Sequence, residues 1–335
     1  MDKRHSMLKD WLSIVLDEPL LSLTPASADA SFRRYFRART EKNSYVVMDA
    51  PPKQEPLEPF IKIDRALIQQ GVHAPLILET DIPNGFLMLE DLGDKTYLNE
   101  LQHTNETLYN DAIKSLVRIQ LGAYEQNQFK IESYDHNLFD HELNLFEDWY
   151  CQKHLTISLS DEQKQIWTKT KRFLIKSCLE QPIVWVHRDF HSRNLMRVEI
   201  NSPAVIDFQD MVLGPISYDL ASLFKDCYIE WPRDVQHRWL EVYLEHASNT
   251  LPQLNISIEQ LIRWVDLTGL QRHLKVLGVF SRLYYRDGKS NYLDDMPLVK
   301  KYILEVSQLY PELSEFSSFF STIEINALDT VTSKN

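Results

Sequence analysis

The spacing of apolar residues divides the chain into a strand-rich first part and a helical remainder. Near the N-terminus an apolar residue recurs every three or four positions, which predicts a helix over residues 6–17. From Leu23 to Met48, aromatic and β-branched residues form runs that are typical of strands. Prolines end this region and lead into a helix expected near 58–70, and Gly71 follows that helix in the position of a C-terminal cap.

Two more strands and then a break in the pattern end the first part. The strands are expected at 76–78 and 86–89, and the stretch Glu90–Gly93 interrupts the sheet pattern. Beyond residue 95 helical periodicity dominates, apart from a short strand at 183–186 and a hairpin that follows it. The expected helices are 96–102, 105–123, 138–150, 160–178, 216–225, 233–249, 258–282 and 296–309.

These elements predict an α+β protein with two lobes, an architecture in which a nucleotide binds between the lobes. Residues 1–92 would form a small β-rich N-lobe that covers the nucleotide. Residues 93–313 would form a large, mainly helical C-lobe that carries the catalytic and acceptor-binding groups. Residues 314–335 are rich in serine, threonine and asparagine, so we expect a loosely ordered C-terminal tail.

A group of three polar residues follows the apolar run 183–186. Asp189 is followed five residues later by Asn194, and Asp207 ends an apolar strand thirteen residues beyond Asn194. A hairpin that turns at 201–203 would bring Asn194 and Asp207 back to the same end. Each residue alone suits a cap, a turn or a strand end, with no shared role. The three together predict a phosphoryl-transfer site, with Asp189 as the catalytic carboxylate and Asn194 and Asp207 as ligands of Mg²⁺.

Composition limits the partners that the protein can have. The chain has 335 residues, and its 36 basic and 48 acidic side chains give a net charge of −12. That charge argues against nonspecific binding to nucleic acid or to an anionic membrane surface. Three widely spaced cysteines argue against a disulfide framework, and no stretch has the length and apolarity of a membrane span or a signal-peptide core. We therefore expect a cytoplasmic protein. We also expect a monomer, although nothing in the composition bears on the oligomeric state.

A run of small side chains lies just before the aromatic strand of the first part. Backbone N–H groups of such a loop can approach phosphates closely, although kinases usually place glycine there and this loop has none. The same residues also suit an ordinary solvated turn and a basic strand. In such a strand side-chain alternation would place Arg34 on one face and Arg33, Arg37 and Arg39 on the other. The residues predicted to bind the nucleotide here are Ser27, Ala28, Asp29, Ala30, Ser31, Phe32 and Arg33.

Two further features concern the nucleotide. Protein kinases carry a phosphate-binding lysine on the third strand of the N-lobe, and the strand expected at 45–49 has none. Lys53, one of the arginines at the loop, or the magnesium ion would have to provide that charge. Farther along, Glu90 and Leu92 stand where the backbone of an extended hinge would bind adenine, although a plain interlobe linker would look similar.

The region after Asp207 bears on the acceptor. Twelve positions separate Asp207 from Asp219, too few for the longer segment that holds a peptide in protein kinases, so a small-molecule acceptor is favoured. Asp219 and His187 are expected to have structural roles near the site, Asp219 as a helix cap or as a hydrogen-bond partner of the catalytic loop. Polar residues of the helix 258–282 either line the cleft or form a basic face in solvent. The acceptor-binding residues that we predict are Phe190, His191, Arg193, Asp226, Arg272 and His273.

These motifs resemble those of a known superfamily over residues 20–310. His187, Asp189 and Asn194, followed by Ile206-Asp207-Phe208 and Tyr218-Asp219, are similar to the motifs of aminoglycoside phosphotransferases and choline-kinase-like enzymes. The resemblance implies a protein-kinase-like two-lobed fold, with ATP as co-substrate and Mg²⁺ as cofactor. Longer strings are similar to the bacterial family of N-acetylmuramate/N-acetylglucosamine anomeric kinases, namely Thr24–Phe36, Met48–Pro52 and Leu270–Lys289.

The narrower resemblance implies a specific reaction. The enzyme would use ATP to phosphorylate the anomeric hydroxyl of N-acetylmuramate and N-acetylglucosamine, giving the α-1-phosphate, in the recycling of cell-wall peptidoglycan. Two alternatives stay open at this point. One is a kinase for another small hydroxylated acceptor, such as an aminoglycoside, choline or homoserine. The other is a nucleotide-binding pseudokinase, which the missing strand lysine and the glycine-free loop would suit.

Overall fold

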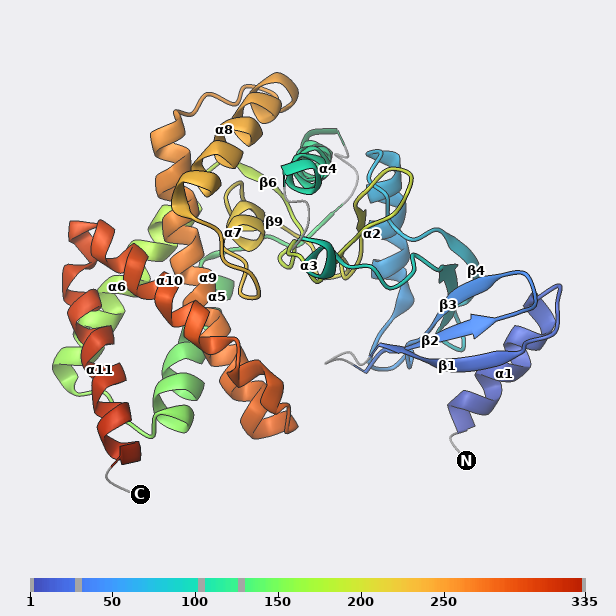
Figure 1. Ribbon diagram of the computed structural model, residues 1–335, viewed down its shortest axis with the longest axis horizontal. Helices are drawn as coiled ribbons and strands as arrows, with labels where there is room; N and C mark the ends of the chain where they lie inside the picture. The colour runs from blue at the N-terminus through green and yellow to red at the C-terminus, as the bar shows by residue number, and fades with distance from the viewer. Residues whose placement is uncertain (1–2, 28–31, 102–105, 126–129, 333–335) are drawn as a thin grey trace. The chain divides into compact units, whose positions relative to one another are not determined.

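The computed structural model describes residues 3–27, 32–101, 106–125 and 130–332, and these form two compact units (Figure 1). Unit 1 consists of Met1–Arg118 and Arg193–Asp210, and unit 2 of Ile119–Ser192 and Met211–Asn335. The predicted N-lobe boundary at residue 92 therefore does not coincide with the boundary of a compact unit. The reason is that the hairpin 193–210 and the segment 93–118 make their contacts within unit 1, although they lie later in the sequence.

Unit 1 is built on an antiparallel sheet whose strands follow the order β1-β2-β3-β5-β4. The helix α1 (Lys3–Val15) covers one face of this sheet, where its buried Leu8 and Leu12 pack on apolar side chains of β2, β3 and β5. Because side chains alternate along a strand, the opposite face carries the other set of residues of the same strands. The strands are β1 (Ser22–Ser27), β2 (Arg34–Arg39), β3 (Ser44–Asp49), β4 (Ile77–Asp81) and β5 (Phe86–Glu90).

The alternation in β2 separates its arginines. Arg34 lies on the face that α1 covers, where the buried Asp49 carboxylate accepts hydrogen bonds from both Arg34 and Arg4. Arg37 lies on the opposite face, together with Tyr35. The positions of Arg34 and Arg37 confirm the prediction that they face opposite sides of a strand. One consequence is that Arg34 serves to attach α1 to the sheet.

The helix α2 (Leu57–Gln69) follows β3 and buries a carboxylate. Asp64 is 1% exposed, and within the described part of the chain its Oδ1 has no hydrogen-bond partner. Burial raises the pKa of Asp64 from 3.8 to about 7, opposed by the Arg65 charge. The helix ends as expected at Gly71, which adopts the left-handed conformation at φ +72.

We expect Asp64→Asn to stabilise the protein at alkaline pH. A carboxyl whose pKa is higher in the folded state destabilises the folded protein progressively as the pH rises from about 4 to 7. At pH 8 the variant should gain on the order of 2 kcal/mol in unfolding free energy, and the gain should be smaller at pH 5. Denaturant unfolding at pH 8 and at pH 5 measures this gain in unfolding free energy. The control is Asp10→Asn on the exposed side of α1. An equal gain in stability at pH 5 and pH 8, or a loss of stability at pH 8, would contradict the raised pKa of Asp64.

A second, smaller hairpin completes unit 1. It consists of β7 (Leu195–Met196) and β8 (Ala204–Val205), which pair in antiparallel register, as the apolar runs around the turn predicted. Backbone bonds attach it to the rest of unit 1, from Arg197 N to Lys95 O and from Val205 N to His73 O. The same unit contains α3 (Tyr97–Glu100) and the first part of α4 (Glu106–Glu125).

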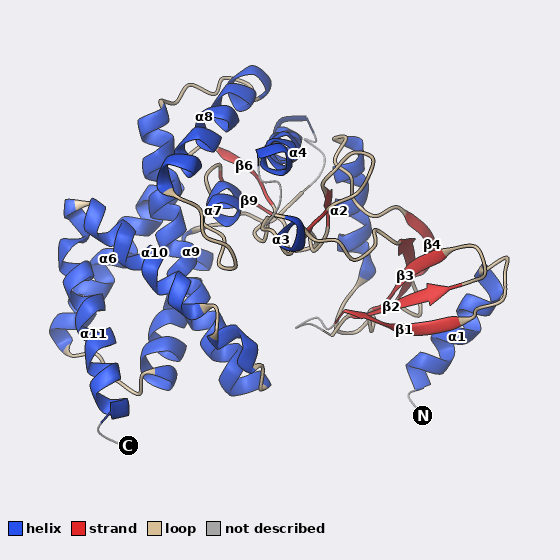
Figure 2. Ribbon diagram, in the orientation of Figure 1, coloured by secondary structure: helices blue, strands red, loops and turns tan. Residues whose placement is uncertain are grey.

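Unit 2 is mainly helical and is organised around one long, buried helix (Figure 2). This helix, α9 (Ile258–Asp287), has its N-cap at Ser257, ends at the left-handed Gly288, and is buried along most of its length. A two-stranded ribbon of β6 (Ile183–Val186) and β9 (Val212–Pro215) belongs to the same unit. Its other α-helices include α5 (His136–Leu145), α6 (Asp161–Leu179), α7 (Tyr218–Phe224), α8 (Arg233–Thr250), α10 (Met296–Leu309) and α11 (Ser314–Thr332). It also has the π-helix η1 (Phe146–His154) and the short 3-10 helices η2 (Ser290–Leu293) and η3 (Pro311–Leu313).

The C-terminal segment corrects one prediction. The expected loose tail is the helix α11, and its first three turns are packed. Four of its side chains are at most 4% exposed, because they recur at helical spacing and pack into the helical core: Phe316, Phe319, Phe320 and Ile323. The small antiparallel sheet and the mainly helical remainder confirm the predicted α+β class.

Candidate active site

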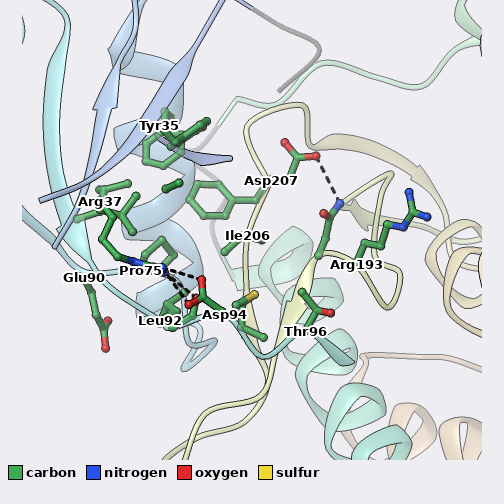
Figure 3. A pocket seen from close by; sticks show the side chains of 18 residues that line it. Tyr35, Arg37, Pro75, Glu90, Leu92, Asp94, Thr96, Arg193, Ile206 and Asp207 are labelled. Carbon is green, nitrogen blue, oxygen red and sulfur yellow. Dashed lines mark hydrogen bonds and ion pairs between the residues drawn. The ribbon is translucent and has the colours of Figure 1, made fainter. Parts of the chain in front are cut away.

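Unit 1 contains a pocket of about 520 Å³, a volume typical of small-ligand sites (Figure 3). One side of the pocket is the sheet face opposite α1, and another is the hairpin that carries Asn194 and Asp207. Apolar side chains from both sides and from α2 make a slot that suits a flat ring. The apolar lining residues are Ala26, Val46, Phe60, Pro75, Leu89, Leu92, Met196, Ile206 and Phe208.

The segment after β5 forms one edge of this pocket. Glu90 and Leu92, the predicted hinge residues, both line it. The backbone N–H of Glu90 donates to Leu76 O at 2.9 Å, and its carboxylate accepts from Leu76 N at 3.2 Å. The His73 ring approaches the same carboxylate at 3.4 Å. Because the Glu90 N–H is already used, purine recognition at this edge would rely on the Glu90 carbonyl and the Leu92 N–H.

Arg37 fixes the position of this edge. Its guanidinium donates to Asp91 Oδ1 at 3.0 Å, to Asp94 Oδ2 at 3.0 Å and to the Gly93 carbonyl at 3.2 Å. Asp91 also accepts a hydrogen bond from Ser44 at 2.5 Å. Although burial opposes it, hydrogen bonds from Ser44 and Arg37 lower the pKa of Asp91. This network attaches the segment after the hinge to β2 and β3, and Arg37 and Asp94 line the pocket.

The hairpin presents two oxygen-bearing side chains side by side. Asn194 Nδ2 lies 3.4 Å from Asp207 Oδ2, and Ile206 N donates to Asn194 O at 3.1 Å. The sequence prediction that a hairpin returns these residues to the same end is confirmed. Asp207 is exposed and has a left-handed backbone at φ +64, which a residue other than glycine adopts at some cost. Gln209 Nε2 donates to the other carboxylate oxygen of Asp207 at 2.8 Å.

Asp189 lies in unit 2, on a loop that begins after β6. The buried Asp219, at the start of α7, accepts from His187 N at 2.6 Å and from Arg188 N at 3.0 Å. A second buried carboxylate, Asp226, accepts from Ser192 N at 2.9 Å. The loop is therefore attached at both ends by carboxylates. Burial raises the pKa of Asp219 to about 7, and the two donated N–H groups oppose that rise.

Cations surround the Asp189 carboxylate. The side chain is 44% exposed, and Arg272 Nη2 of α9 lies 3.7 Å from Asp189 Oδ1. Although burial acts in the other direction, the charges of Lys275, His191 and Arg272 lower the pKa of Asp189 to about 2. Asp189 is therefore ionised at any pH near neutrality.

A buried glutamate balances part of this positive charge. Glu142 of α5 pairs with Arg188 at 2.8 Å and with Lys275 at 2.9 Å. Its carboxylate also accepts a hydrogen bond from the buried Tyr134. Although burial opposes it, the charges of Lys275 and Arg188 lower the pKa of Glu142. The network holds Lys275 and Arg188 in place behind the loop that carries Asp189.

The predicted acceptor residues have different surroundings in the structure. Phe190 is fully buried, with its ring edge-on to His187, and His273 is fully buried, stacked on Tyr302 and bonded to Lys225 O at 2.9 Å. Neither side chain is accessible to a ligand, so both are part of the core, and the prediction that they contact the acceptor is corrected.

The four remaining acceptor candidates divide between the two units. Asp226 is buried and holds the loop of Asp189 through Ser192. The backbone N–H of Tyr228 also donates to the Asp226 carboxylate, at 3.0 Å. His191 and Arg272 remain beside Asp189 in unit 2, at 9% and 4% exposure. Arg193 lies elsewhere, because it lines the pocket of unit 1.

The predicted phosphate loop lies partly outside the described residues, which omit Ala28, Asp29, Ala30 and Ser31. Ser27 is the last residue of β1 and pairs with Tyr35. Phe32 is 66% exposed, and Arg33 lies 3.7 Å from Glu55. Neither Phe32 nor Arg33 is among the described residues that line the pocket, whereas Ala26 is.

Several residues of the site carry no motif that identifies them in the sequence. Arg37, Asp94 and Thr96 line the pocket, and Gln209 contacts Asp207. The only available signal for Arg37 was the alternation of β2, which placed it on the face opposite Arg34. Glu142 and Lys275 meet from helices far apart in the sequence, so their spacing gives no indication of the pair.

Comparison with known proteins decides the family. The model of a phosphotransferase enzyme family matches residues 22–255. The chain belongs to this family. A Pseudomonas putida protein named N-acetylmuramate/N-acetylglucosamine kinase is 42% identical, over 97% of this chain and 98% of that protein. A protein of the same name from Neisseria meningitidis is 40% identical over 93% of each chain.

Solved structures of phosphotransferases share the fold. The choline kinase LicA from Streptococcus pneumoniae has a TM-score of 0.62 at 15% identity, over 90% of this chain and 99% of that one. A spectinomycin phosphotransferase in complex with ADP and spectinomycin has a TM-score of 0.59 at 15% identity, over 95% and 98%. The solved structures confirm the predicted protein-kinase-like fold. The family model and the two relatives confirm the predicted superfamily and the assignment as a phosphotransferase.

Among the residues that the structure describes, no helix combines the length and the apolar character that crossing a membrane requires.

Proposed function

We propose that the protein is an ATP-dependent kinase that phosphorylates the anomeric hydroxyl of N-acetylmuramate and N-acetylglucosamine. The observation that carries the proposal is the 42% identity, over 97% of the chain, to a protein named for these two sugars. The product would be the α-1-phosphate, formed during cytoplasmic recycling of peptidoglycan. Similarity over nearly the whole chain supports the same acceptor better than similarity limited to the nucleotide motifs would.

Asp189 is the group that we assign to the acceptor hydroxyl. A carboxylate with a pKa of about 2 is a weak base, so its main contribution would be to accept a hydrogen bond and orient the hydroxyl for attack. The anomeric hydroxyl belongs to a hemiacetal and is more acidic than an ordinary alcohol, so a weak base suffices. The attachment of the loop by Asp219 and Asp226 supports this role, because orientation requires a rigid carboxylate.

The residues at the end of the hairpin fit a magnesium ion. Asp207 offers a carboxylate and Asn194 an amide oxygen after rotation of its amide, and Mg²⁺ prefers oxygen ligands of this kind. Within the described ranges no group of three or more histidine, cysteine or acidic side chains could hold a metal, which suits an ion that takes its other ligands from phosphates and water. When bound, magnesium would neutralise charge on the transferred phosphoryl group. Asn194 and Asp207 would hold it.

The charges near Asp189 favour an acidic acceptor over a polycation. The positive charges of Arg272 and Lys275 both lower the pKa of the Asp189 carboxyl, and both residues belong to the buried helix α9. N-acetylmuramate carries a lactyl carboxylate, whereas aminoglycosides carry several ammonium groups that positive side chains would repel. We assign Arg272 to the acceptor side, with His191 beside it.

An acceptor panel tests this proposal. Purified protein is incubated with ATP and Mg²⁺ and, in turn, with N-acetylmuramate, N-acetylglucosamine, an aminoglycoside, choline and homoserine, and ADP release is measured. We expect release with the two amino sugars alone. Release with choline or an aminoglycoside only would replace the proposed acceptor, and ATP binding without release for any acceptor would favour a pseudokinase.

A further inference from the structure

Strand β3 provides no cation for a nucleotide phosphate. Val46 of β3 lines the pocket, and because side chains alternate, Met48 is the next residue on that face. Met48 is fully buried and apolar. The position where a protein kinase would present its strand lysine is therefore occupied by a side chain that cannot compensate negative charge.

Three of the cations near β3 that the sequence suggested as replacements, Arg33, Arg34 and Lys53, do not line the pocket. Arg34 pairs with Asp49 on the sheet face that α1 covers, and Arg33 lies beside Glu55. Lys53 is exposed in the turn between β3 and α2. Among the described residues, the pocket is lined by two cationic side chains, Arg37 and Arg193.

These two arginines mark different parts of the pocket. Arg37 contacts Asp91, Gly93 and Asp94, which belong to the segment after the predicted base-binding hinge. Arg193 directly precedes Asn194 in the chain, and Asn194 contacts Asp207. Figure 3 shows Arg193 and Asp207 on the side of the pocket opposite Tyr35 and Arg37, with the Arg193 guanidinium extending away from these residues in this view. The phosphates of a nucleotide whose magnesium is held by Asn194 and Asp207 would lie at the end where Arg193 stands.

We infer that Arg193 provides the positive charge that contacts the nucleotide phosphates, in place of the strand lysine. A guanidinium presents five donors in a planar fork, so it can donate two parallel hydrogen bonds to one phosphate. This role rests on the proposed function, because it requires a nucleoside triphosphate as the phosphoryl donor. It replaces the expectation from the sequence that Arg193 contacts the sugar.

Nucleotide binding to the full-length protein tests the inference directly. The affinities of adenosine, AMP, ADP and ATP are measured by titration calorimetry in the presence of Mg²⁺, for the wild type, Arg193→Ala and Arg193→Lys. We expect Arg193→Ala to weaken ADP and ATP binding roughly 10- to 100-fold and to leave adenosine binding unchanged. Arg193→Lys keeps the charge and loses the fork, so its ATP affinity should lie between those of the wild type and the alanine variant.

The matched control is Arg197→Ala. Arg197 lies four residues along the same hairpin, exposed, and pairs with Glu100 outside the pocket lining. We expect its ATP affinity to stay within about twofold of the wild type. Two results would overturn the inference: unchanged ATP affinity in Arg193→Ala, or an equal loss for adenosine and ATP, which would place Arg193 at the base.

The inference about Arg193 and the proposed function can fail independently of each other. If the wild type binds ATP but phosphorylates neither amino sugar, the acceptor assignment fails while the ligand series still reports on Arg193. If the wild type phosphorylates the sugars and Arg193→Ala raises KM for the sugar alone, with ATP affinity unchanged, the inference fails and the proposed function stands.

Discussion

Replacing Asp189 with asparagine should lower kcat by a factor on the order of 10²–10⁴, with little change in the affinity for ATP. The substitution keeps the size of the side chain and removes the negative charge that accepts the hydrogen bond of the acceptor hydroxyl. It also leaves Arg272 without its anionic neighbour at 3.7 Å. The measurement is steady-state turnover with N-acetylmuramate as acceptor, together with a titration of ATP binding.

The control for this variant is Asp234→Asn on α8. Asp234 is an exposed carboxylate that pairs with Arg238 on the same helix, so its loss should leave turnover unchanged. Because the pKa of Asp189 is about 2, turnover of the wild type should show no acid limb from this group between pH 5 and 8. Near-normal turnover in Asp189→Asn would exclude Asp189 from the chemistry.

Replacing Asp207 with alanine should abolish the dependence of nucleotide binding on Mg²⁺ and reduce kcat by about 10³-fold or more. The variant removes the carboxylate of the pair and leaves Asn194 as the remaining candidate ligand on the hairpin. ATP titrations with and without Mg²⁺ give a readout that does not require turnover. In the wild type, removal of Mg²⁺ should weaken ATP binding, and in the variant it should have no effect.

Asp210→Ala is the matched control, because Asp210 is an exposed aspartate three residues further along the chain and does not line the pocket. We expect it to keep both turnover and the Mg²⁺ dependence of the wild type. If Asp207→Ala kept the same Mg²⁺ dependence of ATP binding as the wild type, Asp207 would have to be removed from the metal site.

The parts of the site that the sequence predicted are those with local causes. The hairpin that joins Asn194 to Asp207 follows from two short apolar runs and a turn, so the proximity of the two side chains was predictable. The alternation of β2 likewise predicted the opposite directions of Arg34 and Arg37. In both cases the information lies within about fifteen residues of the chain.

The parts that the sequence did not predict depend on contacts between distant segments. The pairs between Arg37 and residues 91–94 join β2 to the segment after β5, more than 50 positions away. The pair of Glu142 with Lys275 joins two helices. His273 looked like a cleft residue because it is polar, and only the packing around α9 shows that it is buried. The helix α11 was missed because serine and threonine masked a phenylalanine pattern that was present at helical spacing.

The most direct test of the account is to identify the phosphorylated position of the product. N-acetylglucosamine is converted with ATP and the wild-type protein, and the product is examined by proton-coupled phosphorus NMR. The account predicts that the phosphorus couples to the single anomeric proton, with the α configuration at that carbon. Coupling to the two protons of the C6 methylene group would show phosphorylation of the primary hydroxyl, and would contradict the assignment as an anomeric kinase.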